Sequence, residues 1–276
     1  MKNILVPTDF SECAHHAAEV AVQIAKAANA TIHLLHVVDI PLTSYDAGMH
    51  TYEKIPETMF LMKHAKGSME KLKDESMFKG VEVTTMVEFD LTYSRITNEA
   101  KNKKVDLIVM GSHGVSGFQE LMIGSNAERV VRFAECPVLT IKKRHANFDI
   151  QNIVLASDFK EDSASFFNHF SSFIGLFDAY IHLLKVNTAL NFETTPESRK
   201  LMESFLINHD IKNTSTHIYN DESEEDGILN FSKEVDANLI AIGTHGRTGI
   251  AHLVNGSLAE SVINHAERPV LSIKIR

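Results

Sequence analysis

Hydrophobic residues along the chain alternate between short continuous runs and longer segments with helical spacing. Residues 4–6 form a continuous apolar run, and residues 14–28 then place apolar side chains three and four positions apart, as on one face of a helix. The same alternation continues with predicted strands at 32–38, 81–87, 107–110 and 138–141 and predicted helices at 62–72, 92–101 and 125–133. Strands that alternate with helices indicate a parallel sheet with helices on both faces.

This pattern occurs twice in the chain. NILVPTDF at 3–10 returns as NIVLASDF at 152–159, and Gly-Ser-His-Gly at 111–114 returns as Gly-Thr-His-Gly at 243–246. The first pair of segments is 149 positions apart and the second pair is 132 apart, so the first half carries 17 additional residues. Most of them fall in the turn-rich stretch 41–56, which is either a lid or interface loop or an ordinary surface excursion.

A chain of 276 residues with an internal repeat predicts two domains. We expect one domain at 1–144 and the other at 149–276, joined by a short linker and packed closely together. The two halves are then expected to form an intramolecular pseudo-dimer, and a homodimer of the whole chain is the other expectation.

Each half contains Gly-x-x-Gly, nine further residues, and then Gly-Ser. The two copies of this glycine pattern are Gly111, Gly114, Gly124 and Ser125 in the first half and Gly243, Gly246, Gly256 and Ser257 in the second. The first glycine follows a predicted strand and the Gly-Ser opens a predicted helix, so backbone N–H groups and a helix N-terminus can face a polyphosphate. Glycines that merely end strands and form turns are the alternative, and the repetition at identical spacing favours phosphate binding.

An aspartate ends the first predicted strand of each half, as Asp9 and Asp158. Ligands of open α/β sheets bind outside the carboxyl ends of the strands, so each carboxylate is placed to contact a ribose or base, or a metal that accompanies phosphates. Alternatively, each aspartate caps the helix that follows, together with Ser11 in the first half. Both interpretations remain open at this stage.

Composition and charge exclude several classes of protein. The net charge of −9 argues against nucleic acid as a partner, because a phosphate backbone selects clustered Lys and Arg. No run approaches the roughly 20 apolar residues that span a bilayer, and the short apolar run at the N-terminus is broken by Pro7, so neither a membrane nor a signal peptide is expected. Two cysteines and no zinc-type spacing among the 15 histidines favour a reducing, cytoplasmic location and predict no structural metal site.

These residues resemble the universal stress protein family in its tandem two-domain form. The resemblance covers both halves and rests on VPTDFS at 6–11, HLLHVVD at 33–39, MGSHG at 110–114, CPVLTIK at 136–142 and the complete glycine pattern. It implies an α/β fold of two tandem doubly wound domains, Rossmann-like and similar to adenine nucleotide alpha hydrolases. Each domain would have a five-stranded parallel sheet and would pair through its last strand, and the complete glycine pattern resembles that of the ATP-binding branch.

The resemblance also implies a set of ligand-binding residues. In the first half, Pro7, Thr8, Asp9 and Val37 would surround base and ribose, Met110, Gly111, Ser112 and His113 would line the nucleotide, and Gly114, Gly124, Ser125 and Asn126 would hold the phosphates. The matching positions in the second half are Asp158, Val186, Ile242, Gly243, Thr244, His245, Gly246, Arg247, Gly256, Ser257 and Leu258.

The two predicted sites are not identical. Ala156 and Ser157 replace Pro7 and Thr8 at the base end, whereas Arg247 adds a cation at the phosphate end of the second half. We expect both sites to be usable, and the sequence does not rank them.

Three functions are compatible with this chain. The sequence favours a regulatory module that binds ATP, with Mg²⁺, and contacts a protein partner of unknown identity, with little or no turnover and no catalytic residues. A slow ATPase or phosphotransfer enzyme is the first alternative, against which neither glycine pattern has the Gly-Lys-Ser/Thr of a phosphate-binding loop. An interaction scaffold without nucleotide is the second, against which both glycine patterns are intact.

Overall fold

The computed structural model describes residues 1–39, 56–114, 123–160, 164–209, 211–245 and 258–275. In the first half these residues form β1 (Asn3–Pro7), α1 (Glu12–Ala28), β2 (Thr31–Asp39), α2 (Pro56–Lys73), β3 (Val83–Asp90), α3 (Thr92–Asn102), β4 (Leu107–Gly111), α4 (Ser125–Phe133) and β5 (Val138–Ile141), with one 3-10 turn at Ser76–Phe78. The second half repeats this order as β6 (Asn152–Ala156), α5 (Ala164–Ile174), β7 (Tyr180–Asn187), α6 (Thr195–Asn208), β8 (Thr214–Asn220), α7 (Glu224–Glu234), β9 (Leu239–His245), α8 (Leu258–His265) and β10 (Val270–Ile275). The extra segment 41–56 lies almost wholly outside the described residues.

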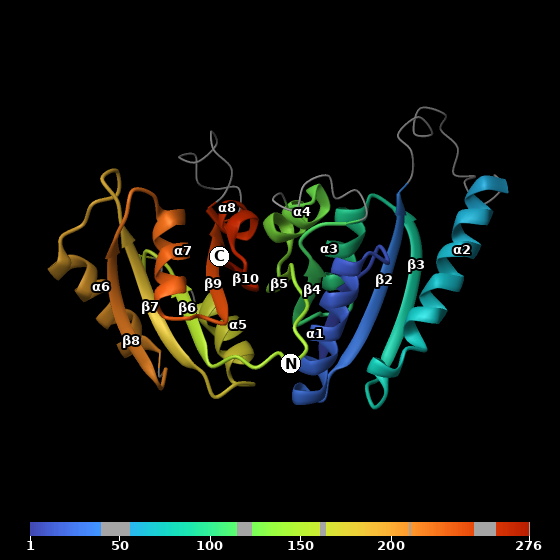
Figure 1. Ribbon diagram of the computed structural model, residues 1–276, viewed down its shortest axis with the longest axis horizontal. Helices are drawn as coiled ribbons and strands as arrows, with labels where there is room; N and C mark the ends of the chain where they lie inside the picture. Colours follow the sequence, from blue (N-terminus) through green and yellow to red (C-terminus); the bar gives the residue numbers. More distant parts are fainter. Residues whose placement is uncertain (40–55, 115–122, 161–163, 210, 246–257, 276) are drawn as a thin grey trace.

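All ten strands belong to one sheet, in the order β3-β2-β1-β4-β5-β10-β9-β6-β7-β8. Within each half every pairing is parallel, as between β1 and β2 or between β4 and β5. The doubly wound α/β fold predicted from the repeat is therefore confirmed, with five parallel strands in each half. Figure 1 shows β5 and β10 at the middle of the molecule, while β3 and β8 are the outermost strands of the sheet.

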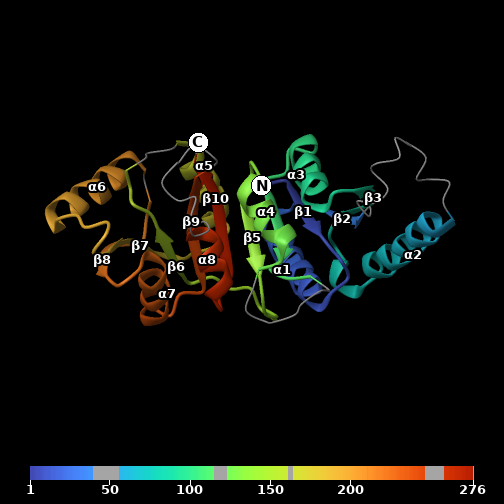
Figure 2. The same ribbon diagram turned by 90° about the horizontal axis from the view of Figure 1, so that it is seen from above.

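Side chains alternate between the two faces of the sheet and produce two apolar cores. In β1, Ile4 and Val6 pack with α1, α2, α5 and α6, whereas Leu5 faces the core formed with α3, α4, α7 and α8. Both cores continue across the two halves, and helices lie on either side of the strands (Figure 2). The continuous apolar runs of the sequence correspond to strands that are buried on both faces.

Helix α1 shows how local chemistry fixes an element. Ser11 is its N-cap and accepts a hydrogen bond from the N–H of Ala14 at 3.2 Å. The helix ends at Asn29, which adopts a left-handed conformation with φ of 51°. Its alanine-rich face is buried against the sheet, and this close packing positions the N-terminus of α1 beside the end of β4, as described below.

The two halves meet where β5 pairs antiparallel with β10, with Leu139 opposite Leu271. The Thr140 hydroxyl donates to the carbonyl of Val270 at 3.2 Å. The pairing through the last strand, which the family resemblance implies, thus occurs inside this chain and creates a pseudo-dimer of the halves.

Both cysteines have structural positions. Cys136 is buried, and burial raises the pKa of its thiol to about 12. The Cys13 thiol donates to the carbonyl of Ile141 at 3.1 Å. Among the described residues, no helix has the length and apolarity needed to cross a membrane, and no group of three His, Cys, Asp or Glu is arranged around a metal position.

Two histidines of the second half form a half-buried pair between β7 and β8. His182 Nδ1 lies 3.2 Å from His217 Nε2, and the Ser215 hydroxyl lies 2.7 Å from the same His217 nitrogen. Both rings pack against Phe231 of α7, and desolvation by burial lowers the pKa of each imidazole. The pair is therefore favoured in its neutral form.

Stability is expected to fall on acidification because of this pair. In the unfolded chain, histidines take up protons near their ordinary pKa of about 6.5, whereas the folded pair does so only at lower pH. The stability that the neutral pair contributes above about pH 6.5 is therefore lost as the pH falls below that value. The double variant H182Q/H217Q should show a smaller decrease in Tm between about pH 7 and pH 5. H64Q, which changes an exposed histidine of α2, is the matched control and should keep the parental pH dependence.

Candidate functional site

The order of the strands creates a switch point at the carboxyl ends of β1 and β4. The chain passes from β1 through α1 to β2 on one side, and from β4 through α4 to β5 on the other, so β1 and β4 are neighbours whose connections lead away in opposite directions. The segments that follow the two strands therefore diverge, and ligands of open α/β sheets bind in the crevice that this leaves. Most of the predicted first-half residues lie at this position.

The turn after β1 is fixed by backbone hydrogen bonds. Thr8 is buried, and its N–H donates to the carbonyl of Leu35 at 2.9 Å, which continues the pairing with β2. Phe10 adopts a left-handed conformation with φ of 64°, and its N–H donates to the Thr8 hydroxyl at 3.0 Å. Oδ1 of Asp9 accepts the N–H of Ser11 at 3.0 Å. Ser11, rather than Asp9, is the N-cap of α1, and Asp9 stabilises the turn that leads into it.

Gly111 permits a close approach between β4 and α1. A methyl group on Gly111 would lie 2.9 Å from the Cys13 sulfur and 3.1 Å from the backbone nitrogen of Ala14. The second of these atoms belongs to the helix backbone and cannot move independently of it. Glycine is therefore required here for packing, which is a structural role in addition to any contact with a ligand.

Gly114 brings the glycine turn against the carboxylate of Asp9. A methyl group on Gly114 would overlap Oδ2 of Asp9, so the Asp9 side chain would have to move to make room for it. Asp9 thus contacts both arms of the site: Oδ1 accepts from the turn after β1, and Oδ2 faces the turn after β4. The Asp9 side chain therefore stabilises the turn that leads into α1 without being its N-cap, and its second oxygen faces the glycine turn.

The two parts of the glycine pattern meet through one hydrogen bond. The N–H of Gly124 donates to the carbonyl of Ser112 at 2.7 Å. Ser112 is completely buried, and its hydroxyl lies 2.6 Å from Nδ1 of His113. Gly124 is the N-cap of α4 and makes no side-chain cap hydrogen bond, so the first N–H groups of α4, at Ser125 and beyond, receive no N-cap oxygen. Ser125 is exposed and Asn126 is half-buried beside it.

Val37 and Met110 lie on one face of this edge. Both belong to the apolar core on the α3 and α4 side, Met110 as a buried member and Val37 as a partly buried one. His36, on the opposite side of β2, has its Nδ1 2.8 Å from the carbonyl of Thr8 and its ring 4.5 Å from that of Phe10. His36 therefore supports the turn after β1. Its supporting role had no distinct signal in the sequence.

The second half builds the same turn with different support. Oδ1 of Asp158 accepts the N–H of Lys160 at 3.1 Å, and Phe159 is left-handed with φ of 57°. Phe159 is buried and packs on Phe205, whereas Phe10 is 37% exposed. Lys185 replaces the histidine, and its ammonium group donates to the Asp158 carbonyl at 3.3 Å.

The same lysine also joins an ion-pair cluster. Glu193 lies 3.1 Å from Lys185 and 2.6 Å from Lys160, and these two hydrogen bonds lower the pKa of Glu193, that from Lys160 contributing most. The base end of the second site is thus tied to the segment before α6, an arrangement that differs from the His36 contact of the first half.

The structure describes the other second-half positions in part. Ile242 and Thr244 are buried in β9, Val186 is partly buried at the end of β7, His245 ends β9 and Leu258 begins α8. A methyl group on Gly243 would meet the side chain of Ile275 at 2.5 Å, a softer obstacle than the helix backbone that faces Gly111. The predicted residues Gly246, Arg247, Gly256 and Ser257 lie outside the described residues.

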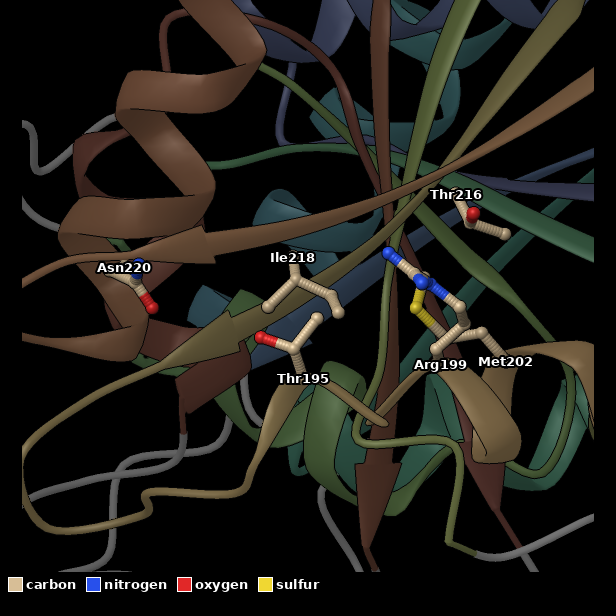
Figure 3. A pocket seen from close by; sticks show the side chains of 6 residues that line it. All are labelled: Thr195, Arg199, Met202, Thr216, Ile218 and Asn220. Atoms are coloured by element: carbon tan, nitrogen blue, oxygen red, sulfur yellow. The ribbon is translucent and has the colours of Figure 1, made fainter. Parts of the chain in front are cut away.

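Two cavities are lined by residues other than the glycines of the pattern. One of about 180 Å³ adjoins the turn after β1 and is lined by Thr8, Phe10, Ser11, His15, Ser68, Lys71, Leu72 and Glu75. The other, of about 280 Å³, lies between α6 and β8 and is lined by Thr195, Arg199, Met202, Thr216, Ile218 and Asn220 (Figure 3). None of the predicted second-half residues lines the larger cavity, and only Thr8 of the predicted set lines the smaller one.

This architecture defines a class: tandem doubly wound α/β domains with a glycine-lined switch point. The model of the universal stress protein family matches residues 1–142 and again 149–274. The chain belongs to the universal stress protein family.

Individual relatives cover one half or the whole chain. Universal stress protein MJ0531 of Methanocaldococcus jannaschii is 36% identical over 143 residues, which are 51% of this chain and 82% of that protein. Universal stress protein Slr1230 of Synechocystis is 22% identical over 296 residues, which cover 99% of this chain and all of that protein. The crystal structure of a universal stress protein from Archaeoglobus fulgidus superposes with a TM-score of 0.72 at 22% identity, covering 99% of this chain and 98% of the other. This last likeness concerns the fold.

The glycines of the site should respond differently to a single methyl group. G111A should destabilise the protein by about 1–3 kcal/mol, because the added carbon overlaps the backbone of α1. G124A should lower the free energy of unfolding by only about 0.5 kcal/mol. Its methyl group would make ordinary contacts at 3.6–3.7 Å, and the small loss reflects the exchange of glycine for alanine at an N-cap. Denaturant unfolding of both variants measures the difference, and equal losses would contradict the assigned packing role of Gly111.

Proposed function

We propose that this protein is a cytoplasmic regulatory module that binds ATP with Mg²⁺ at the switch point of each half and turns it over slowly or not at all. Nucleotide occupancy would act through the shape of the site and its contacts with a protein partner. We also propose that the two modules correspond to residues 1–144 and 149–276.

One observation carries the proposal: three separate segments converge at the carboxyl edge of the sheet. Gly114 adjoins Asp9, Gly124 is bonded to Ser112, and Gly124 begins a helix without a capping side chain. A glycine-lined edge that ends at a helix N-terminus supplies N–H donors and positive potential, the two features that a phosphate group requires. A merely structural turn needs neither.

The residues available at this edge fit an adenine nucleotide in their chemistry. Val37 and Met110 offer apolar surface for a base, Asp9 offers a carboxylate, and Ser125 offers a hydroxyl beside the first N–H groups of α4. The carboxylate would repel phosphates unless a cation lies between them. Mg²⁺ brought with ATP supplies that cation, and carboxylate oxygen is a ligand that Mg²⁺ prefers.

Little turnover is proposed because the chain lacks the groups that phosphoryl transfer uses. In a phosphate-binding loop the lysine directly follows the last glycine. Here Ser125 follows Gly124 and Ser257 follows Gly256, so neither pattern provides that lysine. Asp9 is already committed to the turn after β1 through Oδ1. Slow hydrolysis is the alternative function, and its measurement is included below.

Protein from which bound nucleotide has been removed should be stabilised by Mg-ATP. At 100 times the dissociation constant, binding to one site raises the free energy of unfolding by about 2.7 kcal/mol, which increases Tm by several degrees. The double variant G124V/G256V should lose this shift while it remains folded. GTP and AMP are the ligand controls. No shift at millimolar ATP, or many turnovers per protein in a phosphate-release assay, would contradict the proposed module.

The Asp9 carboxylate makes ATP binding dependent on Mg²⁺. In the parent protein we expect ATP affinity to fall markedly when EDTA replaces Mg²⁺, because an unshielded carboxylate then faces the phosphates. D9N removes the charge but keeps an oxygen acceptor for the N–H of Ser11, so its affinity should depend less on Mg²⁺. Calorimetric titrations with and without Mg²⁺ measure both. An equal Mg²⁺ dependence in the two proteins would assign Asp9 to the ribose or base instead.

A further inference from the structure

A hydrogen bond from the second half reaches the segment of the first half that leads into α4. Asn264 lies in the last turn of α8, and its side-chain Oδ1 accepts the N–H of Ile123 at 2.5 Å. Ile123 immediately precedes Gly124, and its side chain packs against the apolar core shared with α4 and α8. A side chain that is 141 positions away in sequence thus holds the backbone just before the proposed phosphate-binding residues.

Asn264 is itself held firmly in place. Its backbone carbonyl accepts a hydrogen bond from the ammonium group of Lys142 at 2.5 Å, at the end of β5. Val262 and Ile263, which precede it in α8, are buried in the shared core. The acceptor therefore lies on a helix whose neighbouring residues are packed into the seam between the halves.

Two successive N–H groups at the start of α4 consequently have two different fixed partners. The N–H of Ile123 donates to Asn264 of the second half, and the N–H of Gly124 donates to the carbonyl of Ser112 in the first half. Together they set the orientation of the peptide groups that lead into α4. A site whose donors are oriented before the ligand arrives loses less free energy on binding than one whose loop must first be ordered.

The first half cannot return this contact with the matching side chain. Arg132 occupies the position in α4 that corresponds to Asn264 in α8. A guanidinium group only donates hydrogen bonds, so it cannot accept a backbone N–H. Arg132 instead lies 3.3 Å from Glu260 of α8, in an ion pair across the seam. The side chain at the matching position of the first half therefore has no hydrogen-bond acceptor.

We propose that Asn264 is a positioning residue for the nucleotide site of the first half, which is complete only when the second half is folded against it. This inference rests on the proposed ATP binding and deepens it, because it makes the affinity of one site depend on the other half of the chain. The role concerns phosphates and not the base, because Asn264 acts on the entry to α4.

Binding experiments on the full chain with G256V as background isolate the first site. N264L removes the acceptor and should weaken ATP binding about five- to tenfold, the effect of losing one partly buried hydrogen bond. Adenosine, which has no phosphate, should bind within about twofold of the parent. R132L disturbs the same pair of helices without touching Ile123 and should leave both affinities unchanged. An equal loss for adenosine and ATP would indicate a general structural defect and overturn the inference.

Amide hydrogen exchange provides a second measurement that does not depend on a ligand. The N–H of Ile123 should exchange faster in N264L than in the parent protein. If N264L does not fold, N264A serves as the smaller replacement. N264D retains an acceptor oxygen, so its exchange rate should equal that of the parent. Parental ATP affinity in N264L or N264A would overturn this inference and leave the proposed function intact. No ATP binding by the parent would overturn the proposed function and the inference with it.

Discussion

The antiparallel pairing of β5 with β10 is the constraint on which the rest of the molecule depends. Each half alone would present its last strand as an open edge, with unpaired N–H and carbonyl groups. Their pairing covers both edges, joins two five-stranded sheets into one and makes both apolar cores continuous across the chain. It also brings α8 to the entry of α4, so the contact between Asn264 and Ile123 exists only because of this seam.

The candidate site is made largely of backbone, so the proposed binding of an anion is compatible with a net charge of −9. N–H groups and a helix N-terminus act locally, without a basic surface. Glycine is needed for different reasons at different positions. At Gly111 it allows a helix to approach a strand, at Gly114 it leaves room for a carboxylate, and at Gly124 it opens α4. A motif that appears uniform in sequence therefore combines packing with ligand access.

The two halves have kept one turn geometry while changing what supports it. Left-handed Phe10 is partly exposed beside His36, whereas left-handed Phe159 is buried against Phe205. Lys185 and its partner Glu193 form an ion pair, whereas the matching His36 contacts the carbonyl of Thr8. The hydrogen bond from Ile123 to Asn264 adds a further difference, because Arg132 stands at the matching position of the first half.

The sequence by itself determined the order of strands and helices, the tandem repeat and the family. These depend on apolar periodicity and on short motifs, which are local properties of the chain. It also placed Asp9 and the first glycine pattern at the ends of the correct strands. Only the tertiary structure decided that Gly114 meets Asp9, that Gly124 bonds to Ser112, and that Asn264 holds Ile123. Such contacts join distant segments, and their geometry follows from how sheet and helices pack, which no local pattern encodes.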